Sequence, residues 1–299
     1  EGRESGMAQS SRTTGGRRFG VGWMLLSPAL AVYGIIFLLP ALLLVVISFQ
    51  VNAPELYIWE RVYSLENYRR FYTDPFFLKV IGKTLAYCIV VVLATLVVGY
   101  LLAWYIYKAQ SFAKTTLITL VLTPLFSGAL LQSLGWYLLL ARYGPINAGL
   151  RAIGWLDKPF NFLGTDAAVM IALVHAFLPF MVLSILNSLR TIPANLPDAA
   201  ASLGASSWSA FIRVTMPLTK GGMIAGSGLV FGLTLGSFAT PGIVGQGKIQ
   251  LLAQIIYQQA IQVFNWPFAA VISLNLLAIL GVISALLTLL TRRTGGAAR

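Results

Sequence analysis

The segment closest to a chemical motif is GIVGQGKI at Gly242–Ile249, which nearly fits the phosphate-binding pattern G-x-x-x-x-G-K-[ST]. In that pattern the final serine or threonine supplies a hydroxyl for magnesium, and the loop joins a strand to a helix. Ile249 has no hydroxyl, and the segment follows a long apolar run. We therefore expect no nucleotide site in this chain.

The sequence holds one histidine, His175, and one cysteine, Cys88. This excludes an internal disulfide and makes a multi-ligand Cys/His metal site implausible. Cys88 lies in an apolar run, where we expect it to pack. His175 lies four residues before Pro179, and a helix-interior proline leaves a backbone carbonyl without its donor. A neutral His175 could bond that carbonyl, pack, or line a solute pathway. No catalytic arrangement is evident, and we expect neither a metal nor a cofactor on this chain.

Composition places these residues in a membrane. Hydrophobic residues make up 58% of the 299 and charged residues 10%, and the mean hydropathy is +0.80. Soluble domains are about 25% charged, so a soluble chain of this composition would expose apolar surface and aggregate. The formal net charge of +12 does not indicate nucleic acid, because basic residues at the ends of apolar runs fix topology and meet anionic membrane lipid.

A helix needs roughly 20 mostly apolar residues to cross a bilayer, and six stretches qualify. The first is too long for a signal-peptide core, so we interpret it as an uncleaved span. The sequence thus predicts an all-α integral membrane protein with six transmembrane helices: Val21–Phe49, Val80–Tyr107, Thr116–Leu140, Ala167–Leu189, Met223–Val244 and Pro267–Leu290.

The charge distribution predicts the orientation. An even number of spans places both termini on one side, and basic residues favour the inner side. With the termini inside, 12 of the 21 basic residues lie in inner segments, and six of the nine acidic residues lie in outer segments. We expect both termini on the cytoplasmic side.

Five glycines at the start of the fifth predicted span and within it repeat largely at four-residue spacing. Small residues at this spacing let a second helix approach closely. The approaching helix could belong to the same chain, or the stripe could form a sliding or dimer-facing surface. Pro241 and Gly242 are expected to weaken the end of this span. The five are Gly222, Gly226, Gly228, Gly232 and Gly236.

Between the fourth and fifth spans, the inner side carries the small and polar stretch PDAAASLGASSWSAFIRVTMP, residues 197–217. Asn195 can cap a helix start, Pro197 is tolerated in a first turn, and Asp198 complements the helix dipole. The residues that follow, 199–203, carry a thin layer of side chains. Gly204 permits the left-handed conformation that ends a helix.

A second short helix is predicted beyond Gly204. Ser206 or Ser207 can cap it, and Pro217 closes it. Trp208 and Phe211 are aromatic residues of the kind enriched at binding hot spots. The stretch is therefore predicted to form a helix–glycine–helix bracket that lies along the inner membrane face.

These residues resemble the cytoplasmic signature of permease subunits of bacterial binding-protein-dependent ABC importers, E-A-A-x-x-x-G followed nine residues later by I-x-L-P. Here Asp198-Ala199-Ala200 and Gly204 fall in register, and Val214-Thr215-Met216-Pro217 completes the spacing. The segments 64–105, 175–189 and 265–274 look like spermidine/putrescine-type permeases.

The resemblance implies a type I ABC importer permease fold, with a coupling loop at 191–219 between helices 4 and 5. Residues 20–291 would form the permease domain, and residues 1–19 and 292–299 would form cytoplasmic tails, the first of them disordered. In such importers the bracket docks into a groove of a cytoplasmic ATPase subunit. The residues to which the resemblance assigns this coupling are Asp198, Ala199, Ala200, Gly204, Ala205, Trp208, Phe211 and Pro217.

The resemblance also implies partners and a location. They are a cytoplasmic ATPase dimer that binds ATP and magnesium, a related but different second permease subunit, and a periplasmic solute-binding protein. The location is the bacterial inner membrane. Polyamine is the first choice of solute, and an amino-acid derivative, an opine or an aminophosphonate remain alternatives. A membrane enzyme or a passive channel are the alternative classes. Candidate pathway residues in broken spans are Phe126, Gln132, Trp136, Phe180, Phe238 and Thr240.

Overall fold

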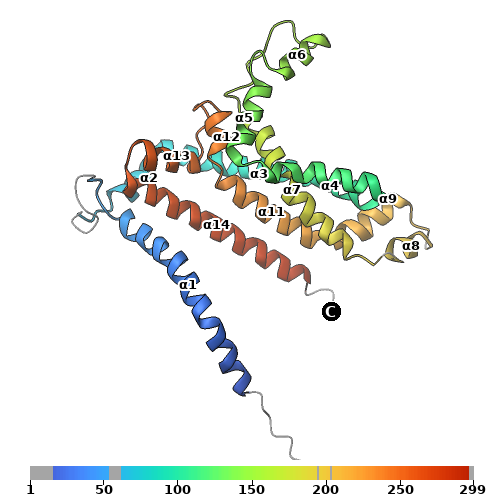
Figure 1. The fold of residues 1–299 in the computed structure, drawn as a ribbon, viewed down its shortest axis with the longest axis horizontal. Coiled ribbons are helices and arrows are strands. Elements are labelled where there is room, and N and C mark those ends of the chain that lie inside the picture. The colour runs from blue at the N-terminus through green and yellow to red at the C-terminus, as the bar shows by residue number, and fades with distance from the viewer. Residues whose placement is uncertain (1–15, 54–61, 194, 203, 296–299) are drawn as a thin grey trace, which may run out of the picture. The chain divides into compact units, whose positions relative to one another are not determined.

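The structure, a computed structural model, describes residues 16–53, 62–193, 195–202 and 204–295 (Figure 1). Apart from a single bridge between Gln50 and Tyr63, the described residues form helices joined by turns and loops. The helix α1 (Gly16–Ser48) belongs to a unit that ends at Ile47, and the rest of the chain forms a second unit. Within α1, the 23 residues Leu26–Ser48 have a mean hydropathy of 2.9, so this helix is long and apolar enough to span a membrane.

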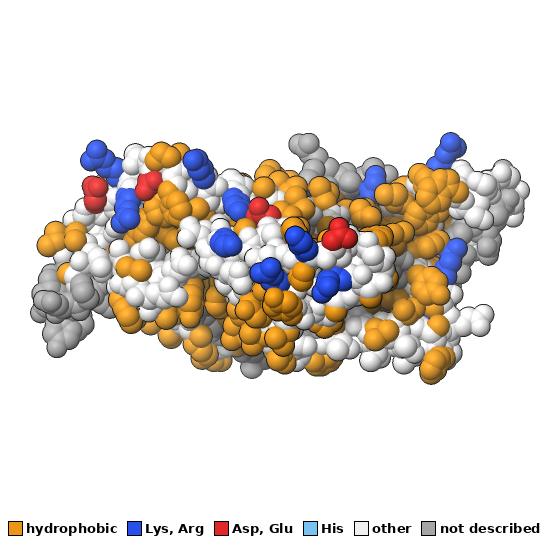
Figure 2. All heavy atoms as spheres, turned by 90° about the horizontal axis from the view of Figure 1, so that it is seen from above, with side chains coloured by type: hydrophobic (Ala, Val, Ile, Leu, Met, Phe, Trp, Pro, Cys, Tyr) orange, Lys and Arg blue, Asp and Glu red, His pale blue; other side chains and the backbone are white. Residues whose placement is uncertain are grey.

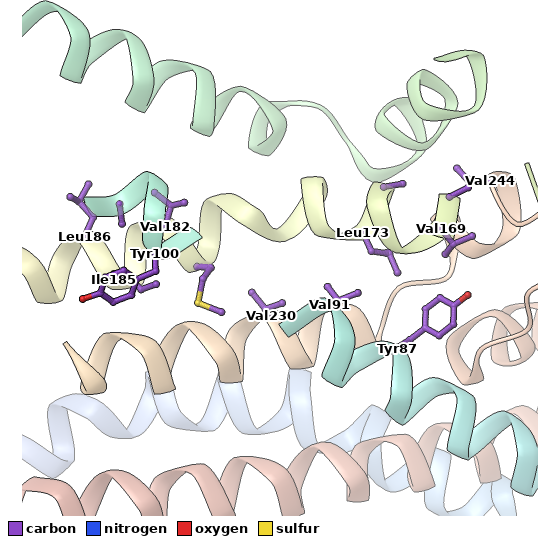
Figure 3. Close-up of a cluster of buried hydrophobic side chains, with 14 of the residues drawn as sticks. Tyr87, Val91, Tyr100, Val169, Leu173, Val182, Ile185, Leu186, Val230 and Val244 are labelled. Atoms are coloured by element: carbon purple, nitrogen blue, oxygen red, sulfur yellow. The ribbon is translucent and has the colours of Figure 1, made fainter. Parts of the chain in front are cut away.

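In the second unit, α3 (Pro75–Lys108), α7 (Asp166–Arg190) and α11 (Lys220–Leu235) pack against one another and form the main core. Figure 3 shows Val91 of α3, Leu173 of α7 and Val230 of α11 meeting in this core, and all three are fully buried. Cys88 is also buried and packs with α11, as expected from its apolar surroundings.

Local polar contacts fix where α3 and α7 begin. Asp74 caps α3 by accepting a hydrogen bond from the backbone nitrogen of Phe76, and Thr165 caps α7. Asp166 follows at the first position of α7, where a carboxylate complements the helix dipole. Its Oδ1 lies 2.8 Å from Nζ of Lys83 and accepts a 2.5 Å hydrogen bond from the hydroxyl of Tyr87. These contacts hold the N-terminal part of α3 against the N-terminus of α7.

The glycine stripe of α11 serves packing within the chain. A Cβ at Gly222 would lie 2.5 Å from the carbonyl oxygen of Ser184 in α7, and one at Gly226 would lie 2.8 Å from Sδ of Met181. Gly228 and Gly232 instead face leucines of α14 (Trp266–Gly295). The structure thus supports the first of the two interpretations of this stripe, close approach by helices of the same chain.

Two predicted spans are broken. The third, predicted as one helix over 116–140, consists of α4 (Ser111–Phe126) and α5 (Ala129–Leu140). The chain turns by 106° between α4 and the segment Ala129–Ala152. Pro124 and Gly128 flank this break, and both disfavour a continuous helix. The fifth is also shorter than predicted, because α11 ends at Leu235 and α12 (Ala239–Ile243) follows a turn. Pro241 and Gly242, which we expected at the break, lie within α12.

Smaller elements complete the second unit. They are α2 (Glu66–Thr73), α6 (Pro145–Ala152), α13 (Leu252–Tyr257) and the π-helix η3 (Gln258–Gln262). The helix α14 contacts α2, α11 and α13. Each predicted tail is partly helical, because α1 starts at Gly16 within the first tail and α14 ends at Gly295 within the second. The remaining tail residues, 1–15 and 296–299, lie outside the described part.

Among the described residues, four helices are long and apolar enough to cross a membrane alone. Six spans result if each of two bent pairs counts as one span, namely Ser111–Phe126 with Ala129–Ala152 and Ser207–Leu218 with Lys220–Leu235. Figure 2 shows apolar side chains over much of one face, with charged groups at separate points. Exposed leucines such as Leu101, Leu131 and Leu138 require lipid or a protein partner as their solvent.

Candidate functional site

The first arm of the predicted bracket is α8 (Asn195–Ser202), which contains Asp198, Ala199 and Ala200. Gly204 follows with φ +84°, the left-handed conformation predicted from the sequence. The backbone nitrogen of Ala205 donates a 3.0 Å hydrogen bond to the carbonyl of Ala200. This five-residue reach is the outer bond of a Schellman motif with glycine at its left-handed position. The first arm therefore ends in a defined turn.

The second arm starts at α9 (Ser207–Ala210), continues as the π-helix η2 (Phe211–Thr215) and ends in α10 (Met216–Leu218). Of the two serines predicted as possible caps, Ser206 is the cap, and it accepts a 3.2 Å hydrogen bond from the backbone nitrogen of Ser209. Pro217 lies in α10, just before the chain bends by 60° into α11. The bracket thus leads directly into a core helix of the bundle.

Aromatic rings join the bracket to α3. The ring of Phe211 lies edge-on to Trp104 with centroids 4.7 Å apart, and Tyr100 contacts the same ring at 5.7 Å. Trp208 stacks on Phe211 at 5.6 Å, yet 69% of its surface remains exposed. The two residues predicted as anchors therefore differ, because Phe211 packs inward and Trp208 faces outward.

Sequence reasoning missed the α3 side of this contact. Trp104 and Tyr100 lie four residues apart in an apolar span, where aromatic residues carry no signal for one particular partner. The hydroxyl of Tyr100 also shares a buried 3.0 Å hydrogen bond with Oγ1 of Thr219, at the bend between α10 and α11. A motion of the bracket would therefore act on both α3 and α11.

Three polar side chains of the predicted pathway region meet between α5 and α7. Nε1 of Trp136 donates a 3.2 Å hydrogen bond to Nδ1 of His175, and Nε2 of Gln132 lies 3.4 Å from the same nitrogen. An indole nitrogen only donates, so Nδ1 is an acceptor and the neutral ring carries its proton on Nε2. The predicted local bond from His175 to a freed carbonyl is replaced by this contact with α5, and His175 lines an apolar cavity of about 400 Å³.

A second group joins α5 to α12. Thr240 shares a 2.9 Å hydrogen bond with Ser133, and both side chains are buried. Phe238 stacks on Tyr257 of α13, with centroids 5.1 Å apart and 15° between the rings. The prediction did not include Ser133 or Tyr257, because each meets its partner through the packing of separate helices and no local sequence pattern records that contact.

The remaining pathway candidates stand apart from these groups. Phe126 ends α4 and is 87% exposed, whereas Phe180 packs against the main core. Among the described residues, no three His, Cys, Asp or Glu side chains lie close enough to hold a metal ion. The segment GIVGQGKI starts within the last residues of helix α12 and does not follow a strand, and its Gln246 and Gly247 adopt positive φ.

Residues 95–296 match the family model described as "Binding-protein-dependent transport system inner membrane component". The spermidine/putrescine transport system permease protein PotB of Escherichia coli (strain K12) is 32% identical over 262 residues, which cover 88% of this chain and 91% of PotB. PotB of Haemophilus influenzae is 30% identical over 82% of this chain and 85% of its own length.

Solved structures agree on the fold. A crystal structure of a bacterial ABC transporter involved in the import of alginate superimposes with a TM-score of 0.71, at 18% identity, over 93% of this chain and 96% of that one. The inward-facing MetNI methionine ABC transporter gives a TM-score of 0.57 at 18% identity, over 73% of this chain and 95% of that one. The type I permease fold is thereby confirmed.

The relatives are named as permeases, which confirms the expectation of a non-catalytic transport subunit and a multi-pass inner membrane protein. The resemblance noted at the bracket therefore extends over most of the sequence. The chain belongs to the family of inner membrane components of binding-protein-dependent transport systems and is a permease of an ABC importer.

Proposed function

We propose that this chain forms, with a second and related permease subunit, the pathway by which an ABC importer takes up polyamine. In this proposal a periplasmic binding protein delivers the solute, and ATP and magnesium bind to a cytoplasmic ATPase dimer. The observation that carries the solute class is the similarity to PotB, which extends over 88% of this chain.

The bracket supports the coupling part of the proposal. Its two arms meet at Gly204, its exposed Trp208 is available to a partner, and its Phe211 contacts α3. An element that transmits motion needs one contact with the ATPase and another with the membrane helices. We propose that the ATPase docks on the face that carries Trp208 and that both termini lie on the same, cytoplasmic side.

The charges of the helices are compatible with a cationic solute that passes without tight binding. Within the helices α3–α7 and α11–α14 themselves, leaving out the loops between them, the only acidic residue is Asp166. Its carboxylate is already paired with Lys83. A transport path must release its solute again, so strong fixed charges along it are a disadvantage. Uncharged acceptors and aromatic faces attract an ammonium group more weakly, by about 0.5–2 kcal/mol for each cation–π contact.

The test is uptake into proteoliposomes that contain the full complex, its binding protein and internal ATP. Labelled putrescine, spermidine, an opine, an aminophosphonate and sulfate are compared at equal concentration. We expect ATP-dependent accumulation of putrescine or spermidine and none without ATP. Accumulation of only a zwitterionic or anionic solute would overturn the polyamine assignment, and accumulation without ATP would contradict the importer mechanism.

A further inference from the structure

The segment between α5 and α7, residues 141–165, forms an arm built around α6, which lies beyond the end of α5 in Figure 1. We call this segment the α6 arm. It carries four charged residues, whereas α5, which leads into it, carries none. The arm is therefore suited to water and α5 to lipid. The charged residues of the arm are Arg142, Arg151, Asp157 and Lys158.

The α6 arm and the bracket lie at opposite ends of α7. The arm ends at Thr165, directly before α7 begins, and the bracket follows the end of α7 at Arg190. A helix of 25 residues is about 37 Å long, which exceeds the roughly 30 Å of hydrocarbon in a bilayer. The membrane therefore separates a partner that binds the arm from a partner that binds the bracket.

Buried contacts hold the α6 arm in one shape. Asn147 is buried, and its Nδ2 donates 3.0 Å hydrogen bonds to the carbonyls of Ala141 and Phe160. Its Oδ1 accepts a 2.9 Å hydrogen bond from the backbone nitrogen of Phe160. Leu140, directly before the arm, and Leu163, near its end, are buried in the main core. Because the arm is already ordered, a partner that binds it pays little for ordering it.

This ordered arm presents aromatic side chains to solvent. Tyr143 is 85% exposed and Trp155 is 78% exposed, and Ile153 is exposed beside Trp155. The guanidinium of Arg142 lies 5.9 Å from the centroid of the Tyr143 ring. Aromatic residues and arginine are enriched where proteins bind one another. Exposed apolar side chains on a charged segment therefore indicate a docking surface.

Charge decides what kind of partner fits the α6 arm. Three basic residues against one acidic residue give the arm a net charge of +2. An acidic protein face would complement this charge and be steered toward the arm. Anionic lipid would share the attraction to the basic residues, but Asp157, two positions after Trp155, would meet like charge on a lipid surface. The charges therefore favour a protein partner.

We propose that the α6 arm is the docking surface for an acidic face of the periplasmic solute-binding protein. In this complex Trp155 and Tyr143 are buried at the centre of the interface, and the basic residues of the arm lie at its rim. The identity of the partner and the side of the membrane rest on the proposed function. The location of the surface rests on the arm itself.

The experiment measures binding of the cognate solute-binding protein to the purified full complex in phosphatidylcholine nanodiscs, by biolayer interferometry. We expect Trp155→Ala to raise the Kd about tenfold or more, because truncation of a central tryptophan removes a large part of an interface's binding energy. Trp266→Ala is the matched control, since Trp266 is an exposed tryptophan at the start of α14 and lies outside the arm. It should bind like the unmodified complex. Unchanged binding by Trp155→Ala, or equal weakening by both variants, would overturn the docking surface.

The charge of the α6 arm supplies a second, independent variant. Arg151→Glu should lower the association rate constant about fivefold at low salt and much less at high salt, because salt screens exposed charges. An unchanged rate constant at low salt would contradict an acidic partner face. Size-exclusion chromatography identifies variants that fail to assemble. Failure of both Trp155→Ala and Arg151→Glu to assemble would assign the arm to contacts within the complex and overturn the proposal.

A fluorescent label distinguishes a protein partner from a lipid surface. Ala152→Cys in a Cys88→Ala background places the label at the exposed end of α6. We expect its emission to change when the binding protein is added and to resist quenching by brominated lipid. Quenching by brominated lipid without the binding protein would overturn the proposal in favour of a lipid contact.

The same measurements separate this inference from the proposed function. If Trp155→Ala binds the binding protein normally and the unmodified complex accumulates polyamine, the docking surface fails and the proposed function stands. If the unmodified complex does not bind the binding protein at all, both fail. If it binds the protein through the arm but accumulates a different solute, the docking surface stands and the polyamine assignment fails.

Discussion

The ring of Phe211 in the bracket lies 4.7 Å, centroid to centroid, from the ring of Trp104 in α3. The two residues are separated by more than 100 positions, and they connect the segment proposed to bind the ATPase with the first helix of the core. Trp208 stacks on Phe211 and remains exposed. Trp208, Phe211 and Trp104 therefore form a continuous series of ring contacts from the exposed face of the bracket to α3.

Truncation of the two aromatic residues of the bracket should affect ATPase attachment and solute uptake differently. We expect Trp208→Ala to weaken ATPase attachment tenfold or more, because exposed tryptophans at interfaces cost about 2 kcal/mol or more when truncated. Phe211→Ala should retain most of the attachment but lose uptake, since it removes the contact with α3. Attachment is measured by co-purification of the ATPase and uptake in proteoliposomes.

Phe112→Ala is the control for this pair, because Phe112 is an exposed aromatic residue of α4 that lies outside the bracket. It should leave both attachment and uptake near the unmodified values. Equal loss of attachment in the Trp208 and Phe211 variants would contradict the division of roles.

The contact between α7 and α11 should be sensitive to one methyl group. A Cβ at Gly222 would lie 2.5 Å from the carbonyl oxygen of Ser184, so Gly222→Ala must push the two helices apart. We expect a loss of about 1–3 kcal/mol, as for other overpacked cores, seen as a lower melting temperature of the complex in detergent. Gly221→Ala is the control, because a Cβ there meets nothing within 4 Å. Equal melting temperatures would show that α7 and α11 are not packed this closely.

The orientation of the chain can be tested with single cysteines in a Cys88→Ala background. Asn52 and Ser207 are both exposed, and they lie on opposite sides of the predicted topology. Asn52→Cys should react with an impermeant thiol reagent added to whole cells after the outer membrane is opened. Ser207→Cys should react only in inverted vesicles. The opposite pattern would place the bracket outside and remove its proposed role.

The helical class and the bracket could be predicted because their signals are local. Apolar run length, the glycine at position 204 and the serines that follow it each act within a few residues. The helix breaks at 127–128 and 236–238 were harder to predict, because Pro124 and Pro241 indicate a region in which a helix is weakened but not the residue at which it ends. The pairs Phe211–Trp104, Trp136–His175 and Ser133–Thr240 could not be predicted. Each depends on how distant helices pack, and a single sequence carries no record of that.

The central claim, that the bracket couples the ATPase to the helices, is tested most directly by ATP-dependent uptake with Gly204→Val and Gly221→Val. A Cβ at either glycine meets nothing within 4 Å, but only Gly204 has a positive φ. Valine at Gly204 should therefore cost about 1–2 kcal/mol of backbone strain and reshape the turn. We predict that Gly204→Val assembles yet loses at least nine-tenths of its uptake, whereas Gly221→Val transports normally. Equal uptake by the two variants would contradict the coupling role of the bracket.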